Sequence, residues 1–270
     1  MWLDLLPGAE YDNNLEGLLK TTRLAASNAR SAGGASRERV ARYLTFCAEA
    51  TARLRHALRK SSLDDLLLTR RYWAILGMDP TSQAAGELVD LELFDCEWRL
   101  GEAEDAVHEE WEAWMQAGIL IVPDTNGLLH ALPDGPTIAT ADWRGFAEVR
   151  PMDKITVVLL LAVIDELDKT KRNNDRSKAR MRLKEINGLL GTGFRSLVAP
   201  SGNGVAETYL GVMLDDPDHE PLAHTDSEII DRTLSLEQRA GRPVHLVTGD
   251  TGMMIRAAHV DLMCHQVETP

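Results

Sequence analysis

The sequence predicts an all-α region over residues 1–118, followed by an α/β region with a central parallel sheet over residues 119–270. In the first region glycine and proline are sparse, and Ala, Leu, Glu and Arg dominate, as is typical of helices. In the second region apolar runs alternate with helical segments, which is typical of βαβ units. Three of these apolar runs end in acidic residues, and this pattern indicates where a functional site lies.

The composition excludes some classes of protein. The chain has 270 residues and a formal net charge of -13, which argues against a passive nucleic-acid coat but not against an enzyme with one basic strip. Cys47, Cys96 and Cys264 predict neither a disulfide framework nor a CxxC metal site, and a reducing cytoplasm is expected. No apolar run reaches the ~20 residues that span a bilayer, and the start lacks the features of a signal peptide, so we expect no membrane association.

Three helices are expected in the all-α region. One runs from Ser36 to Lys60, with its apolar residues on one stripe. A capping box that begins at Ser62 predicts a short helix that reaches Trp73. Asp79, which precedes a proline, predicts the N-cap of a long helix that ends near Ala117.

Apolar residues recur at spacings of three and four along the long helix. They are Leu93, Cys96, Leu100, Ala103, Val107, Trp111 and Trp114. We favour the interpretation that this stripe packs on neighbouring helices, which is the usual meaning of such a period. The alternative is a surface for a protein partner or for self-association, with Trp111 and Trp114 as its anchors.

Acidic residues follow the predicted strands of the α/β region. The apolar runs are Ile119–Val122 before Asp124, Thr156–Ile164 before Asp165 and Glu166, and Val244–Thr248 before Asp250. A further acid, Asp226, lies where a helix begins, and 196–219 predicts a strand-and-loop insertion near the site. Each acid alone is explained as a turn, cap or first-turn residue.

Several acids at the ends of parallel strands are harder to explain structurally. Such carboxylates repel one another when they lie close together, and a bound divalent cation offsets the repulsion. Ligand sets made of oxygen alone favour Mg²⁺ or Mn²⁺ over zinc. The sequence therefore predicts a site for Mg²⁺ or Mn²⁺ at this edge of the sheet.

Four blocks of the α/β region resemble, in order, the motifs of the PIN-domain family, in particular its larger bacterial type. The blocks are Asp124–His130, Val163–Lys171, Asp226 with Ile229 and Ile230, and Val247–Ala257. The resemblance covers about residues 119–270. It implies a Rossmann-like α/β/α fold and a metal-dependent ribonuclease that acts on RNA.

The resemblance also implies roles for individual residues. The metal-binding acids are Asp124, Glu166, Asp226 and Asp250; Asp165, Asp168 and Asp231 are neighbouring alternatives. Thr248 would position a ligand or a water, and Asn126 would brace the first loop. Single-stranded RNA is the favoured substrate, although the chemistry requires no 2′-hydroxyl.

Basic residues crowd into the stretch that follows Glu166. The residues expected to hold phosphates are Lys169, Lys171, Arg172, Arg176 and Lys178. A run of charge is more often a solvated helix face, but in so acidic a chain contact with phosphates becomes about as plausible.

A second class of function remains open at this point. The chain could be a catalytically silent PIN-like module whose helical region docks a protein partner. A toxin-like nuclease held by an antitoxin is a third interpretation, which the long helical region disfavours.

Overall fold

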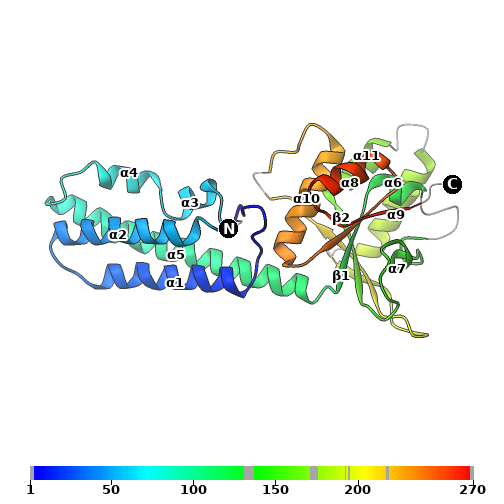
Figure 1. Ribbon diagram of the computed structural model, residues 1–270, viewed down its shortest axis with the longest axis horizontal. Helices are drawn as coiled ribbons and strands as arrows, with labels where there is room; N and C mark the ends of the chain where they lie inside the picture. Colours follow the sequence, from blue (N-terminus) through cyan, green and yellow to red (C-terminus); the bar gives the residue numbers. More distant parts are fainter. Residues whose placement is uncertain are drawn as a thin grey trace. The chain divides into compact units, whose positions relative to one another are not determined.

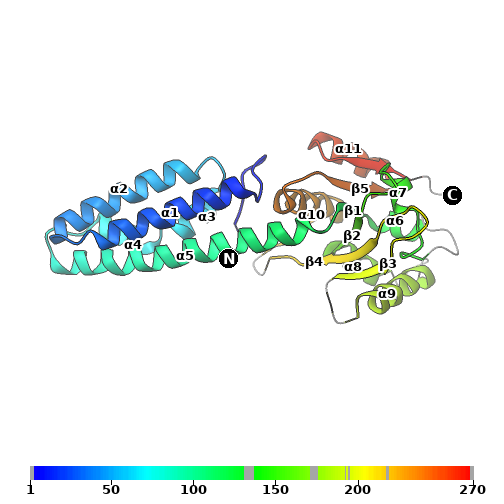
Figure 2. The same cartoon turned by 90° about the horizontal axis from the view of Figure 1, so that it is seen from below.

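The computed structural model describes residues 3–130, 137–170, 176–191, 193, 195–216 and 219–267. The chain divides into two compact units: residues 1–113 with 238–241, and residues 114–237 with 242–270. The first unit is helical, and Figures 1 and 2 show α1, α2 and α5 running side by side in it. Its helices are α1 Asn13–Ser31, α2 Ser36–Leu54, α3 Lys60–Leu66, α4 Arg70–Leu76 and α5 Gln83–Met115.

The second helix is shorter than the sequence predicts. It ends at Leu54, and Leu58 instead forms a β-bridge with Leu5. The backbone N–H of Arg59 donates to the carbonyl of Asp4 at 2.8 Å. Pairing with the N-terminal segment therefore replaces the last helical turn, and helix propensity alone did not reveal it.

Two predicted caps are also wrong. Ser62 lies inside α3, where its hydroxyl accepts a hydrogen bond from the N–H of Asp4 at 2.7 Å, and a separate helix, α4, contains Trp73. Asp79 accepts from the N–H of Thr81 in a turn, and the long helix begins later, behind Ser82.

The apolar stripe on α5 is a core face, as the sequence favours. Leu93, Cys96, Leu100, Ala103 and Val107 are buried in the core of the helical unit. The aromatic residue that follows them on the stripe, Trp111, is partly buried against the same core.

The second unit contains a six-stranded sheet with the order β3-β4-β2-β1-β5-β6. All neighbouring strands are parallel except β3 and β4. The strands are β1 Ile119–Pro123, β2 Ile155–Leu160, β3 Arg195–Ala199, β4 Thr208–Met213, β5 Val244–Thr248 and β6 Cys264–Gln266. The helices are α6 Thr125–His130, α7 Trp143–Phe146, α8 Leu161–Thr170, α9 Arg176–Leu190, α10 Thr225–Ala240 and α11 Thr251–His259. The predicted fold class, an all-α region before an α/β domain with a mainly parallel sheet, is confirmed.

Two strand predictions need correction. The run Thr156–Ile164 contains the end of β2 at Leu160 and the first turn of α8, so Glu166 lies on a helix rather than at a strand end. The segment 196–219 is not simply an insertion, because β4 pairs in parallel with β2 inside the sheet. A continuous apolar run is compatible with a buried strand and with a buried helix turn, which explains the first error.

No helix within the described ranges is both long enough and apolar enough to cross a bilayer.

Candidate active site

Asp124 follows β1 and is 2% exposed. Its Oδ1 accepts a hydrogen bond from the N–H of Gly127 at 2.6 Å, and its Oδ2 accepts one from the hydroxyl of Thr248. Gly127 lies so close that an added Cβ would come 3.1 Å from that Oδ1. The carboxylate is thus held by neutral donors on both oxygens.

The surroundings of Asp124 disfavour its negative charge. Burial raises the pKa of this carboxyl to about 6, the hydrogen bonds from Thr248 and Gly127 oppose the rise, and the charges of Glu166 and Asp250 add to it. The last two effects require those acids to lie near Asp124. The structure therefore brings together three of the four predicted acids.

Thr248 connects two of these acids. It ends β5, is completely buried, and donates its hydroxyl proton to Asp124. The same oxygen accepts from the N–H of Asp250 at 2.9 Å. Asp250 is also the N-cap of α11, since its Oδ1 accepts from the N–H of Met253 at 2.8 Å. The cap interpretation of Asp250 and a role in the site are thus compatible.

Glu166 is held by a residue that the sequence analysis missed. Its Oε2 accepts a hydrogen bond from the hydroxyl of Thr125 at 2.5 Å, and Thr125 is 6% exposed. Thr125 stands next to Asp124, so one short segment fixes acids from β1 and α8. Asn126, which we expected to brace this loop, is exposed, and its side chain makes no hydrogen bond to the described residues.

Asp226 differs from the other predicted acids because it is paired with a cation. It is in the first turn of α10, and its Oδ2 accepts from the guanidinium of Arg256 on α11 at 2.7 Å, with both side chains about half exposed. The alternative acid, Asp231, is ion-paired with Arg232 at 2.7 Å. Arg256 falls within the fourth motif, but its pairing across two helices gave no signal in the sequence.

The residues of the basic stretch differ in their exposure to solvent. Lys169 and Arg176 are exposed, Lys178 is partly exposed, and none of the three forms an ion pair with described residues. Lys171 and Arg172 lie outside the described residues. Arg182, from the same stretch, is 3% exposed and donates to the carbonyl of Leu128 at 3.1 Å, so it supports the fold instead of a solvent-facing contact.

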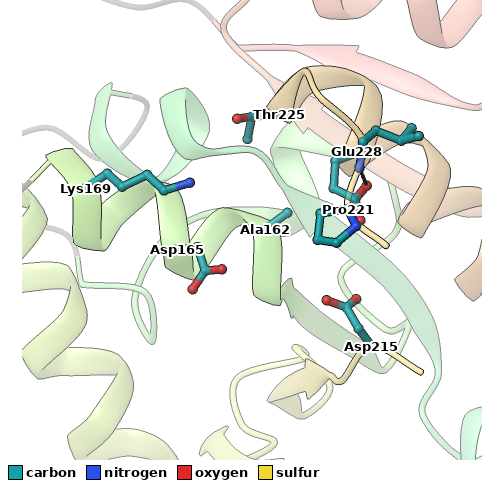
Figure 3. A pocket seen from close by; sticks show the side chains of 8 residues that line it. Ala162, Asp165, Lys169, Asp215, Pro221, Thr225 and Glu228 are labelled. Carbon is teal, nitrogen blue, oxygen red and sulfur yellow. Dashed lines mark hydrogen bonds between the residues drawn. The ribbon is translucent and has the colours of Figure 1, made fainter. Parts of the chain in front are cut away.

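A pocket of about 80 Å³ lies at the carboxyl ends of β2 and β4. Figure 3 shows the side chains around it, with Asp165 and Lys169 on α8, Asp215 after β4, and Thr225 and Glu228 on α10. Burial raises the pKa of the Asp215 carboxyl above its usual range, while nearby cationic residues oppose the rise. Helices α8 and α10, which carry the predicted acids Glu166 and Asp226, thus both contribute side chains to this pocket.

One group of three in the described part of the chain has metal-ligating atoms within 4.8 Å of one another, and it is Asp215, His219 and Glu228. The predicted acids are more widely spaced. Their donor set still fits Mg²⁺ or Mn²⁺, because the buried carboxylate of Asp124 is influenced by the charges of two further carboxylates and has no cationic partner among its hydrogen-bond donors.

Comparison with known proteins identifies the second unit. No curated protein matches the chain. A family model described as PIN domain matches residues 121–268, which is more than half of the chain and includes all four predicted acids. The chain therefore belongs to the PIN-domain family.

Proposed function

We propose that the protein is a Mg²⁺- or Mn²⁺-dependent ribonuclease that hydrolyses phosphodiester bonds of single-stranded RNA. The nuclease domain would be residues 119–270, preceded by the helical region 1–118, in a reducing cytoplasm. The observation that carries the proposal is the buried carboxylate of Asp124, whose charge is opposed by neighbouring acids and balanced by no cation among its hydrogen-bond donors. PIN-domain membership supports nuclease chemistry for this arrangement.

Asp124, Glu166 and Asp250 would hold the metal, and Asp226 would complete the site directly or through water. When bound, the metal would lower the pKa of a water and stabilise the charge that develops on the phosphate. Thr248 fixes Asp124 relative to Asp250, because its hydroxyl donates to the carboxylate of Asp124 and accepts from the backbone N–H of Asp250. These contacts hold the carboxylates in place before substrate arrives.

Residues around the acids would contact the RNA. Lys169, Arg176 and Lys178, together with Lys171 and Arg172, would hold phosphates away from the scissile bond. These contacts supply binding energy but little choice of sequence. The exposed position of Asn126 in α6 leaves its amide available to the substrate.

The test is cleavage of a labelled single-stranded RNA in Mn²⁺, in EDTA, and by Asp124→Asn. We expect metal-dependent cleavage that leaves 5′-phosphate ends and falls at least ~1,000-fold in the variant, since a principal metal ligand is lost. Asp261→Asn is the matched control, because this exposed residue has φ 57°, a conformation that asparagine tolerates. Equal cleavage by the wild type and Asp124→Asn would overturn the proposal.

A protein-binding role for the helical region has separate support. Leu91, Phe94 and Trp98 on α5 are 49%, 55% and 63% exposed and lie on one helical stripe, and Trp73 on α4 is 61% exposed. Our prediction placed the anchors at other tryptophans of α5, which the structure shows to be partly buried. Sedimentation velocity of the wild type and of Phe94→Ser/Trp98→Ser tests self-association through this stripe, and an unchanged monomer in both would argue against it.

A further inference from the structure

A second group of ligating side chains lies beside the proposed active site. Asp215 follows β4, His219 lies in the segment that leads to α10, and Glu228 is near the start of that helix. One ligand atom of each lies within 4.8 Å of the other two. The imidazole distinguishes this group from the all-carboxylate set around Asp124, since nitrogen donors favour a different class of cation.

The pocket is the first sign that this group takes a ligand. Asp215 and Glu228 line it, together with Asp165 from α8 (Figure 3). Its volume of about 80 Å³ admits a cation with several waters. The carboxylate of Asp215 accepts no hydrogen bond from the described residues, although it is only partly exposed. A carboxylate without a donor beside a polar cavity is available to a cation.

Arg232 gives a second, independent sign. This residue of α10 is 8% exposed, and its Nε lies 3.7 Å from Oε1 of Glu228. Its Nη1 is buried and finds no acceptor in the described part of the chain. A buried donor without an acceptor costs free energy. Nε and Nη2 of this guanidinium donate to Asp231, so Nη1 is the nitrogen left for an oxygen ligand of a bound cation.

We propose that Asp215, His219 and Glu228 form a second metal site, which binds Zn²⁺. Zinc accepts imidazole nitrogen and carboxylate oxygen in tetrahedral geometry, and three protein ligands leave its fourth position open. That position would face the pocket, which Asp215 and Glu228 line.

The present contacts need only small changes to accept the ion. Nε2 of His219 lies 2.5 Å from Oε1 of Glu228, whereas two ligands of one tetrahedral zinc lie roughly 3.4 Å apart. Oε2 of Glu228 is already held by the N–H of Leu222 at 2.7 Å, which orients the carboxylate and leaves Oε1 for the metal. Zinc would thus replace the direct contact between His219 and Glu228.

Bound zinc would stabilise part of the domain's structure, and this effect does not depend on the proposed nuclease activity. Zinc would tie the segment between β4 and α10 to the first turns of α10. Glu228 lies one helical turn from Thr225 and two residues beyond Asp226, so the ion would fix the helix end that carries a predicted acid of the active site. A hard oxygen-ligand site and a zinc site would then lie side by side in one domain.

The test measures Zn²⁺ binding to the full chain by isothermal titration calorimetry, in millimolar Mg²⁺ to occupy the oxygen-ligand site. The variants are His219→Gln, Asp215→Asn and Asp124→Asn, and Glu220→Gln is the control for an exposed acid on the same segment. Co²⁺ absorption spectra provide a second readout, because tetrahedral coordination with a nitrogen ligand gives characteristic visible bands. A metal-free thermal melt of each variant establishes that it is folded.

We expect the wild type, Asp124→Asn and Glu220→Gln to bind one zinc with the same affinity, and His219→Gln and Asp215→Asn to bind it at least ~100-fold more weakly, since they lack a ligand. Asp215→Asn serves if His219→Gln does not fold, because Asp215 makes no hydrogen bond to the described residues. Three results would overturn the site: no zinc bound by the wild type, zinc binding lost in Asp124→Asn, or zinc binding unchanged in His219→Gln and Asp215→Asn. Failure of RNA cleavage would leave this measurement unaffected.

Discussion

Each of the two units buries carboxylates, and the most buried one in each has the opposite kind of partner. Glu92 in the helical unit is 1% exposed and Asp124 in the PIN domain is 2% exposed. Glu92 accepts hydrogen bonds from Arg99 at 2.7 Å and Arg71 at 3.1 Å. Asp124 receives only neutral donors and faces further acids.

The two carboxylates differ in how the cost of their burial is offset. Burial of a charge is unfavourable, and a structural carboxylate offsets the cost with cations at short range. Asp124 lacks that compensation among its hydrogen-bond donors, and this is the observation behind the metal site that we propose for it. Burial alone does not separate the two residues, whereas their partners do.

The largest expected change in stability follows from removing the charge of Glu92. Glu92→Gln removes the negative charge shared by Arg71 and Arg99, and we expect the helical unit to lose about 3 kcal/mol, the lower end for a broken buried pair because Arg71 is 40% exposed. Urea denaturation measures the change. Glu97→Gln, which breaks a partly exposed pair with Arg30, is the control and should cost about 0.5 kcal/mol. Equal costs for the two variants would remove the distinction between buried and surface pairs.

Removal of the charge at Asp124 should stabilise the folded protein, which is the opposite of the effect expected at Glu92. Its folded pKa of about 6 lies above the ordinary 3.8, so the ionised form is disfavoured in the folded state above pH 6, by about 3 kcal/mol, and the effect vanishes below about pH 4. Asparagine avoids the buried charge but offers one acceptor to two donors, Gly127 and Thr248. Asp124→Asn should therefore stabilise the metal-free protein by about 1–2 kcal/mol at pH 8.

Thermal or urea denaturation in EDTA at pH 8 and pH 5 measures this difference. The stabilisation should shrink at pH 5, where the wild-type carboxyl is mostly protonated. A variant less stable than the wild type at pH 8 would show that Asp124 is a structural residue of the same kind as Glu92.

The same pKa predicts a pH dependence for metal binding. A carboxyl with a pKa of about 6 is about nine-tenths ionised at pH 7 and about one-eleventh ionised at pH 5, so Mn²⁺ should bind about tenfold more weakly at pH 5. Calorimetry in the His219→Gln background isolates this site from the proposed zinc site. Affinity that is unchanged between the two pH values would mean that Asp124 is not a ligand.

The parts predicted correctly from the sequence depend on local patterns. The runs Ile119–Val122 and Val244–Thr248 were placed correctly, because a run of four or five apolar residues before a polar turn is too short for a typical helix and favours a buried strand. The parts that were missed depend on contacts between distant residues. Helix α2 ends early because Leu58 pairs with Leu5, and Ser62 turns its hydroxyl to Asp4.

The candidate site shows the same difference between local patterns, which the sequence reveals, and contacts between distant residues, which it does not. The acids Asp124 and Asp250 each follow an apolar run that forms a strand. Because the carboxyl ends of parallel strands meet at one edge of a sheet, the sequence implies that these two acids lie near each other. The hydrogen bond from Thr125 to Glu166 joins residues 41 positions apart and depends on how α8 lies on the sheet. The pairing of Asp226 with Arg256 depends in the same way on two helices, and no local pattern encodes it.

The smallest expected effect is a change in RNA binding when exposed basic residues of the two units are replaced. Arg176→Ala and Lys178→Ala should each weaken binding of single-stranded RNA by about three- to tenfold in EDTA, and each lost phosphate contact should reduce the slope of log K against log salt by about 0.7. Lys20→Ala, an exposed lysine of the helical unit, is the control and should change neither quantity. If all three variants bind equally, the basic stretch is a solvated helix face, and the RNA contacts lie elsewhere. If only the PIN-domain variants weaken binding, Arg176 and Lys178 of α9 contact the RNA, as we propose.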